Sequence, residues 1–288
     1  MIKQLIEQTN KPLLFVGGYN ALIAYIAELA GADGIWLSSF ELSACHGLPD
    51  ADMVSTDEYS RLVDSITDTT DIPLLVDANE GHGNALSVMK LVRDYEKNGA
   101  NGIVIEDNLY PKENSFYKGD KRLENPHVFC GKLLAAKDNT SDNFFVGART
   151  EAFIAGFGLE DALERALLYE QYADAIIVHS KMKIDEEVRS FAVEWKKVGK
   201  KPLICIPTTY NHVNYLDLYD LGYKLLILAN YGLRSSVKAI REVYDKIVKG
   251  KSLSEGNELV CSMKEIFDLV FVDTFKETEK KFIGDFEK

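Results

Sequence analysis

Short apolar runs recur along the chain, and each is followed by a polar or glycine-containing turn. The runs are apolar throughout instead of alternating, which is typical of strands that are covered on both faces, as in parallel sheets. The runs that we predict to be strands are residues 12–18, 33–39, 72–78, 101–107, 144–150, 174–180, 202–208 and 223–229.

The segments between these runs carry apolar residues three and four positions apart, which is the spacing of an amphipathic helix. Examples are residues 21–29, 85–97, 159–172, 186–198 and 233–248. Strands that alternate with helices in this way predict a (β/α)8 TIM-type barrel, with residues 1–288 forming a single domain. An open, doubly wound sheet is the alternative, and the absence of a Gly-x-Gly-x-x-Gly turn disfavours it.

One more apolar-periodic stretch, residues 260–285, follows the eighth strand–helix unit. We predict an additional C-terminal helix here. Two arrangements remain open for this helix: it packs on its own barrel, or it reaches a neighbouring subunit.

The composition limits which kinds of partner we expect the protein to bind. The chain has 288 residues, with 33 Lys and Arg against 45 Asp and Glu, so its formal net charge is −12. This surplus of acid repels phosphate backbones and anionic lipids, so we expect no nucleic-acid partner and no membrane partner. The four cysteines are scattered and no apolar run approaches the roughly 18 residues of a membrane span, so we expect a reduced, cytoplasmic protein.

Polar side chains gather where the predicted strands end, which is the edge that carries the active site in such barrels. Acids, a cation and an imidazole follow successive strands: Trp36, Ser38 and Ser39; Asp77, Asn79 and Glu80; Glu106 and Asp107; Arg149 and Glu151; His179 and Lys181. Carboxylates on neighbouring strand ends suit a hard cation such as Mg²⁺, and an adjacent arginine suits an anionic substrate.

Each of these residues also has a structural explanation. Arg149 and Glu151 would form a salt bridge at the rim, Asp77 would cap the next helix, and the acids at 106 and 107 would be solvated. The clustering of all these types at one edge favours the functional interpretation. The loop at residues 108–126 is long enough to be either a functional lid or a disordered segment. The loop at residues 45–55 would bring a carboxylate over the barrel mouth, and a plain acidic surface loop is its alternative interpretation.

The motifs resemble those of the phosphoenolpyruvate mutase/isocitrate lyase superfamily, and within it the mutase family, over nearly the whole chain. EDNLYPKENS at 106–115 is similar to the mutase pattern Glu-Asp-Lys…Asn-Ser, and VDANEGHGN at 76–84 is similar to Asp-Ala-Asp-Thr-Gly-Tyr-Gly-Asn. GARTEAFIAGFG at 147–158 and ILANYGLRSSV at 227–237 add to the resemblance.

The resemblance implies a Mg²⁺-dependent interconversion of phosphoenolpyruvate and phosphonopyruvate, a small anionic substrate, and a homo-oligomer with the last helix exchanged between subunits. It implies that Asp50 receives or steers the phosphoryl group, and that Arg149 and His179 contact it. The other implied roles are metal binding by Asp77, Asn79 and Glu106, substrate binding by Trp36, Ser38, Ser39 and Phe40, and gating by Lys112, Asn114 and Ser115.

Several positions depart from the family pattern. Asn79 replaces the second Asp of the metal motif, His82 replaces a Tyr, and Asn108 replaces the Lys after Glu-Asp. Glu80 is a candidate to compensate for the charge missing at Asn79, although strand geometry would direct it elsewhere.

Related activities remain as alternatives. The carbon–carbon lyases carry a Lys-x-Cys-Gly-His lid that this chain lacks, so they are disfavoured. Phosphonopyruvate hydrolases tend to have Thr where mutases have the Asn found at 114, so this residue favours a mutase. A non-catalytic binding barrel is the remaining alternative, because of Asn79.

Overall fold

The computed structural model describes residues 1–112 and 121–283. Its centre is a closed barrel of parallel strands in which β1 pairs with β2 and, at the other end of the sheet, with β8. The strands are β1 Leu13–Gly17, β2 Gly34–Leu37, β3 Leu74–Asp77, β4 Gly102–Glu106, β5 Phe145–Thr150, β6 Ala175–Val178, β7 Leu203–Cys205 and β8 Tyr223–Leu228. Each lies within its predicted run, so the predicted (β/α)8 barrel is confirmed.

Both faces of the strands are covered by apolar side chains. In β3, Leu75 points into the barrel interior, where it belongs to a cluster with Phe15 and Trp36. Its neighbours Leu74 and Val76 belong to the second cluster, which packs under the surrounding helices. The strands are therefore apolar at every position because alternate residues serve two different cores.

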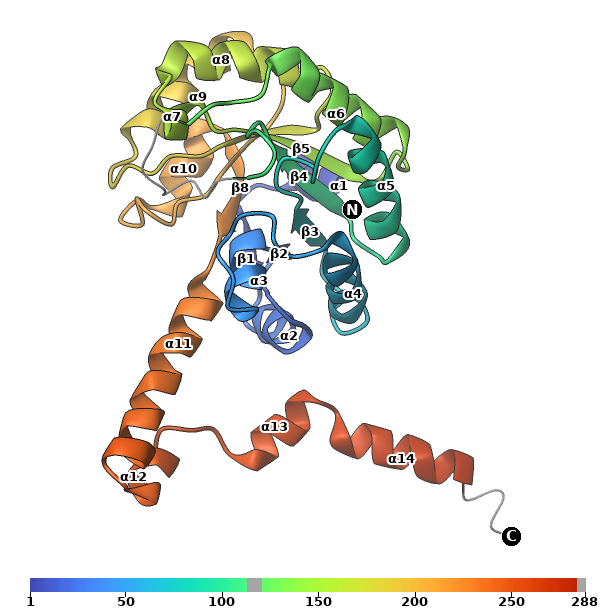
Figure 1. Ribbon diagram of the computed structural model, residues 1–288, viewed down its shortest axis with the longest axis vertical. Helices are drawn as coiled ribbons and strands as arrows, with labels where there is room; N and C mark the ends of the chain where they lie inside the picture. Colours follow the sequence, from blue (N-terminus) through green and yellow to red (C-terminus); the bar gives the residue numbers. More distant parts are fainter. Residues whose placement is uncertain (113–120, 284–288) are drawn as a thin grey trace. The chain divides into compact units, whose positions relative to one another are not determined.

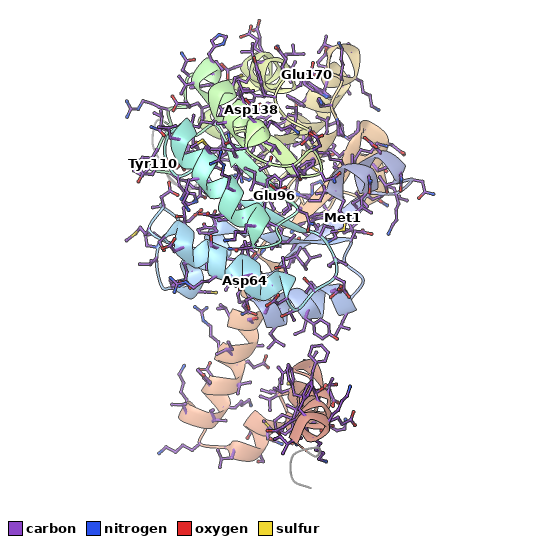
Figure 2. The ribbon with its side chains drawn as sticks, turned by 90° about the vertical axis from the view of Figure 1, so that its right-hand side faces the viewer. Met1, Asp64, Glu96, Tyr110, Asp138 and Glu170 are labelled. Atoms are coloured by element: carbon purple, nitrogen blue, oxygen red, sulfur yellow. The ribbon has the colours of Figure 1, made fainter. Side chains whose placement is uncertain are left out.

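Helices surround the barrel in chain order (Figure 1). In the first compact unit, Met1–Tyr231, they are α1 Ile2–Gln8, α2 Ala21–Leu29, α3 Ser39–Cys45, α4 Thr56–Thr67, α5 Ala85–Lys97, α6 Pro126–Asp138, α7 Ala152–Ala155, α8 Gly158–Tyr169, α9 Glu186–Val198 and α10 Tyr215–Leu221. Figure 2 shows α4, α5 and α6 side by side, with Asp64, Glu96 and Asp138 labelled on them. Asn84, Ser55 and Asn125 cap the N-termini of α5, α4 and α6, which accounts for where these helices begin.

The chain from Gly232 to Lys288 forms a second compact unit. Its described part contains most of α11 (Tyr231–Tyr244), a π-helical turn at Asp245–Lys249, α12 (Leu253–Asn257), α13 (Met263–Leu269) and α14 (Val272–Ile283). C-terminal helices are thus present, and the stretch predicted as one helix at 260–285 contains two, α13 and α14. No residue of α13 or α14 is buried, so their apolar side chains need a further surface to cover them. Among all described residues, no helix is long and apolar enough to cross a bilayer.

Gly34 marks a close approach between β1 and β2. A methyl group on Gly34 would lie 2.4 Å from the ring of Phe15, its partner in the strand register. Phe15 is fully buried in the interior cluster and has no room to move away. We therefore expect Gly34→Ala to lower the free energy of unfolding by about 1–3 kcal/mol, the usual cost of overpacking.

The control for this substitution is Gly131→Ala, in the middle of α6. A methyl group there meets no atom within 4 Å. Because alanine is the better helix former, we expect this variant to gain about 0.5–1 kcal/mol. Thermal unfolding followed by circular dichroism compares the two variants. A Gly34→Ala protein that unfolds at the wild-type temperature would contradict the tight contact.

Candidate active site

Five polar side chains converge at the C-terminal edge of the barrel. Asp77 ends β3 and Glu106 ends β4; Arg149 is the register partner of Glu106 on β5, and His179 follows β6 directly. Asp50 comes from the loop after α3. All five residues are at most 7% exposed, so they form a buried polar cluster and not a solvated rim. The site predicted from the strand ends is therefore brought together in space.

The ammonium group of Lys112 lies among these acids. Its Nζ donates to Ser39 Oγ at 2.9 Å and to Asn79 Oδ1 at 2.8 Å. It also lies 3.2 Å from Asp50 Oδ2 and 3.7 Å from Glu106 Oε1. Burial by itself would lower the pKa of Lys112, but the surrounding carboxylates outweigh burial and raise it. Lys112 is therefore charged and holds groups from four separate segments together.

Arg149 uses three different nitrogens on three different partners. Its Nε donates to Glu151 Oε1 at 2.6 Å, its Nη1 lies 3.3 Å from Glu106 Oε2, and its Nη2 is 2.7 Å from His179 Nδ1. His179 Nδ1 also lies 2.8 Å from Glu151 Oε1. Burial and then the charge of Arg149 lower the pKa of His179, so the imidazole is neutral. The arginine and the histidine thus form one rigid unit at the end of β5 and β6.

Asp77 is held by the start of α3. Its Oδ2 accepts from the Ser39 hydroxyl at 2.9 Å and from the Ser39 amide at 3.4 Å, while Oδ1 accepts from the Asn79 amide at 3.3 Å. Burial would raise the pKa of Asp77, but the charges of Lys112 and Arg149 prevail and lower it. Asp77 is therefore an ionised carboxylate of the site, and its alternative interpretation as a helix cap is wrong, since Asn84 caps α5.

The two acids that end β4 have different roles. Glu106 Oε1 accepts from Asn108 Nδ2 at 2.8 Å, and burial raises the pKa of Glu106 to about 7 despite the nearby Lys112 and Arg149. Asp107 turns outwards and accepts from Tyr169 at 2.7 Å and from the Glu151 amide at 2.8 Å. Neither is a solvated loop acid: Glu106 is 1% exposed and Asp107 is 0% exposed.

Asp52 forms a layer behind the cluster. Its carboxylate accepts from Asn79 Nδ2 at 2.6 Å and from the Lys112 backbone amide at 3.0 Å, and it lies 3.3 Å from His82 Nδ1. Glu80 does not replace the charge missing at Asn79, because burial and then the nearby Asp52 raise the pKa of Glu80 to about 9 and leave it protonated at neutral pH. The sequence signal for Asp52 is its spacing in the pattern Asp50-x-Asp52, in the same loop as Asp50.

The residues predicted to bind substrate are spread over several environments. Trp36 packs in the barrel interior, the Ser38 hydroxyl caps α3 by accepting from the Glu41 amide, and the side chain of Phe40 is 40% exposed. Only Ser39 has a hydrogen bond to the acidic cluster that the structure records. The predicted gating residues Asn114 and Ser115 lie outside the described residues.

The oxygen donors of this cluster fit Mg²⁺. Among the described residues, no three carboxylate, imidazole or thiol groups are arranged to hold a metal ion by themselves. Mg²⁺, however, is usually bound by one or two carboxylates together with water and substrate oxygens. Asp77 and Glu106 supply two carboxylates, and Asn79 adds an amide oxygen, which accepts from Lys112. The buried Glu106 Oε2 lies 3.3 Å from Arg149 Nη1 but accepts no hydrogen bond from the described residues. The donor set is therefore that of a site completed by its substrate.

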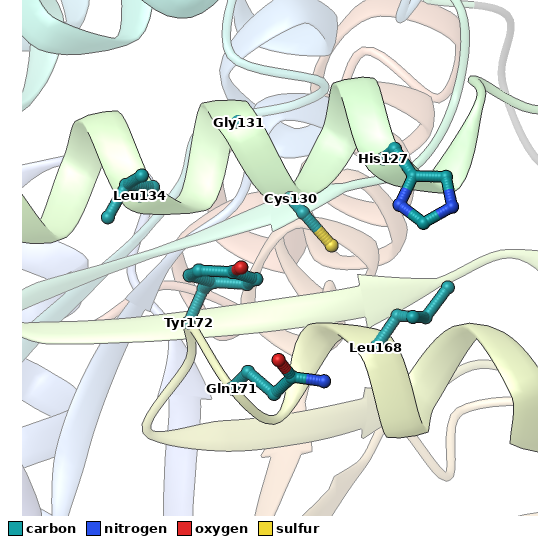
Figure 3. Close-up of a pocket in the computed structure, with 7 residues that line it drawn as sticks. All are labelled: His127, Cys130, Gly131, Leu134, Leu168, Gln171 and Tyr172. Carbon is teal, nitrogen blue, oxygen red and sulfur yellow. The ribbon is translucent and has the colours of Figure 1, made fainter.

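Two pockets differ in what they offer a small anion. One of about 490 Å³ is lined by Ala51, by residues 108–112, and by Lys121 and Arg122, so it carries three cations and shares Lys112 with the acidic cluster. The other, of about 370 Å³, lies between α6 and α8 (Figure 3). Its described lining residues, which include Cys130, Leu134 and Tyr172, contain no Asp, Glu, Lys or Arg. Of these two pockets, the first offers positive charge to an anion; it adjoins the acidic cluster through Lys112 and is not lined by Asp77, Glu106 or Arg149.

A closed α/β barrel with a buried cluster of carboxylates and cations at its strand ends defines a class of enzymes that act on small anions. Within that class, the chain belongs to the phosphoenolpyruvate mutase/isocitrate lyase superfamily: the family model described as phosphoenolpyruvate phosphomutase matches residues 2–248. The resemblance inferred from the motifs is thereby confirmed.

Phosphonopyruvate hydrolases and phosphoenolpyruvate phosphomutases are both among the relatives that the chain resembles over nearly its whole length. The chain is 37% identical to phosphonopyruvate hydrolase of Variovorax sp., covering 93% of each chain. It is 36% identical to phosphoenolpyruvate phosphomutase of Tetrahymena pyriformis, covering 98% of this chain and 94% of the relative. A crystal structure of phosphoenolpyruvate phosphomutase from Streptomyces platensis superposes with a TM-score of 0.95 at 36% identity, covering 98% of both chains. A phosphonopyruvate hydrolase complex with oxalate and Mg²⁺ gives 0.91 at 34% identity, again with 98% coverage of both.

Proposed function

We propose that this protein is a Mg²⁺-dependent phosphomutase that interconverts phosphoenolpyruvate and phosphonopyruvate. The observation that carries the proposal is the convergence of Asp50, Asp77, Glu106 and Arg149 around the ammonium group of Lys112. This arrangement combines oxygen donors for a hard cation with fixed positive charge for a substrate that bears a carboxylate and a phosphoryl group.

Asp77 and Glu106, with the amide oxygen of Asn79, would hold the Mg²⁺ ion. When bound, the ion supplies positive charge that stabilises an enolate and a phosphoryl oxygen. The solved hydrolase relative with oxalate and Mg²⁺ supports the choice of this ion, since oxalate has the shape and charge of a pyruvyl enolate.

The chain's own residues then divide the work on the substrate. Arg149 would bind the phosphoryl group through its guanidinium nitrogens, with neutral His179 beside it as a further hydrogen-bonding group. Lys112 would neutralise negative charge that moves during the transfer. Asp50 would receive or steer the phosphoryl group as it passes between carbon and oxygen, and its place 3.2 Å from Lys112 supports this role.

Exclusion of water decides between a mutase and a hydrolase. The charged groups of the site are nearly completely buried, which is compatible with a site that excludes water. Asn114 on the predicted gating loop, where hydrolases tend to have Thr, favours the mutase. Hydrolysis of phosphonopyruvate to pyruvate and phosphate is the second candidate, supported by the 37% identity to the Variovorax hydrolase.

Phosphorus NMR separates these activities. Phosphonopyruvate is incubated with the protein and Mg²⁺, with an EDTA-treated sample as the control. We expect the phosphonate signal to be replaced by that of phosphoenolpyruvate, and we expect EDTA to stop the conversion. Inorganic phosphate together with pyruvate would instead establish the hydrolase, and no turnover in the presence of Mg²⁺ would indicate a binding barrel.

The assembly remains a proposal as well. We propose that residues 1–288 act as one functional domain within a homo-oligomer, a dimer or tetramer, in which the apolar faces of α13 and α14 are covered by a neighbouring subunit. Light scattering that reports a monomer at micromolar concentration would contradict this arrangement.

A further inference from the structure

Asp52 joins three loops of the candidate active site. It lies in the loop after α3, and its side chain is 2% exposed. Its carboxylate accepts from the side chain of Asn79 after β3, approaches His82 of the same loop, and accepts from the backbone amide of Lys112 after β4. A substitution at Asp52 therefore affects both the loop that carries Asn79 and the segment that carries Lys112.

The contact with Asp52 also determines which way the Asn79 amide faces. A side-chain amide has one donor end and one acceptor end. Asp52 Oδ1 is 2.6 Å from Asn79 Nδ2, and only a donor fits opposite a carboxylate. The acceptor end, Asn79 Oδ1, is consequently turned towards the Lys112 ammonium at 2.8 Å. Asp52, which accepts at one end of the amide, and the Lys112 ammonium, which donates at the other, therefore favour the same orientation, and loss of Asp52 removes one of these two constraints.

The distribution of charge around position 79 also points to Asp52. The family pattern has an acid at position 79, and this chain has a neutral amide there. The negative charge of Asp52 lies one hydrogen bond behind that amide, and it polarises the amide so that its oxygen is a better acceptor. The negative charge that position 79 lacks is thus supplied by Asp52, one hydrogen bond further from the site.

We propose that Asp52 is a positioning residue that supplies, through Asn79, the negative charge and the oxygen orientation that the metal side of this active site requires. The inference rests on the proposed Mg²⁺ site, but it concerns only how this chain builds that site.

The backbone permits a direct exchange of the two residues. Asp52 has φ +55° and Asn79 has φ +49°, and both Asp and Asn tolerate this left-handed conformation. In the double variant Asp52→Asn/Asn79→Asp, the new amide at 52 donates to the new carboxylate at 79 and its oxygen still accepts from the Lys112 amide. The exchange therefore preserves the shape, the total charge and these two hydrogen bonds, while the contact of residue 52 with His82 Nδ1, at 3.3 Å, passes from a carboxylate oxygen to an amide nitrogen.

The test measures metal affinity without any substrate. Mn²⁺ is titrated into the metal-free wild-type protein, Asp52→Asn, Asn79→Asp and the double variant, and the free ion is followed by electron paramagnetic resonance. We expect Asp52→Asn to weaken Mn²⁺ binding by about 10–100-fold, the usual effect of removing a partner of a metal ligand. We expect the double variant to recover most of that loss.

Asp71→Asn is the matched control. Asp71 is exposed and precedes β3, so it lies at the opposite end of that strand from Asp77. Its substitution removes the same charge as Asp52→Asn. We expect this control to bind Mn²⁺ like the wild type. Circular dichroism identifies any variant that does not fold; if Asp52→Asn fails to fold, a folded double variant with restored affinity still supports the inference.

Coupling between the two positions is the decisive quantity. Wild-type affinity in Asp52→Asn, or an Asn79→Asp effect that is the same with either residue at 52, would overturn the inference, because the positions would then act independently. Steady-state kcat and KM for phosphonopyruvate separate this outcome from failure of the proposed function. If Mn²⁺ binding is coupled but there is no turnover, the inference holds and the proposed activity is refuted. If turnover is normal but there is no coupling, the activity holds and the inference is refuted. A wild-type protein that binds no Mn²⁺ overturns both.

Discussion

Replacing Asp50 with alanine is expected to abolish turnover of phosphonopyruvate while leaving Mg²⁺ and oxalate binding largely intact. The carboxylate is the group that we place on the path of the phosphoryl transfer, and loss of a group that reacts directly costs on the order of 10⁴-fold or more in kcat. Binding should persist because Lys112 keeps its contacts with Ser39, Asn79 and Glu106 after Asp50 is removed. Phosphorus NMR measures the turnover, and calorimetry with oxalate and Mg²⁺ measures the binding.

Asp64→Ala controls for loss of an aspartate. Asp64 is exposed on α4 (Figure 2) and has no contact with the acidic cluster that the structure records, so we expect wild-type turnover for this variant. If Asp50→Ala retained near-normal turnover, the role assigned to Asp50 would be wrong even if the rest of the site were correct.

The second large effect is expected for Arg149→Lys, although this substitution keeps the positive charge. Three separate nitrogens of Arg149 serve Glu151, Glu106 and His179 at 2.6, 3.3 and 2.7 Å. One ammonium group has no fork with which to reach all three partners, so the phosphoryl pocket loses its geometry. We expect kcat/KM to fall by about 10²–10³-fold, comparable to the loss of one fixed donor to a developing charge.

Arg93→Lys provides the comparison for this change. Arg93 is exposed on α5 and donates to Asn139, so the same substitution alters only a surface contact. Its kinetics should equal those of the wild type. Equal kinetics for Arg149→Lys would show that charge alone is needed at that position, and that the guanidinium geometry has no catalytic part.

The barrel and the main acids of the site could be predicted from the sequence because both depend on local patterns. Strands that are buried on both faces are apolar at every position, and Leu74, Leu75 and Val76 illustrate why: they alternate between two cores. In a parallel barrel the C-terminal ends of all strands lie at one edge, so residues predicted at strand ends, such as Asp77, Glu106 and Arg149, are expected to converge there.

The supporting groups could not be predicted because they depend on contacts between loops. The spacing Asp50-x-Asp52 marks Asp52 as a candidate, but it does not indicate that Asp52 contacts Asn79 and the Lys112 amide, since these loops are far apart in the chain. Asp107, next to Glu106, has a different role because β4 directs it towards Tyr169 on α8. The structure records Trp36, which the family pattern implies for substrate binding, in the interior cluster, and its role stays a prediction.

A crystal structure of the protein with Mg²⁺ and oxalate tests the central claim most directly, namely that these separate strand ends form one metal-dependent site. We predict that the ion lies at Asp77 and Glu106, bound directly or through water, and that oxalate lies on it within hydrogen-bonding distance of Arg149. Oxalate and Mg²⁺ bound elsewhere, or a soaked crystal in which Asp50, Asp77 and Glu106 contact neither, would contradict it.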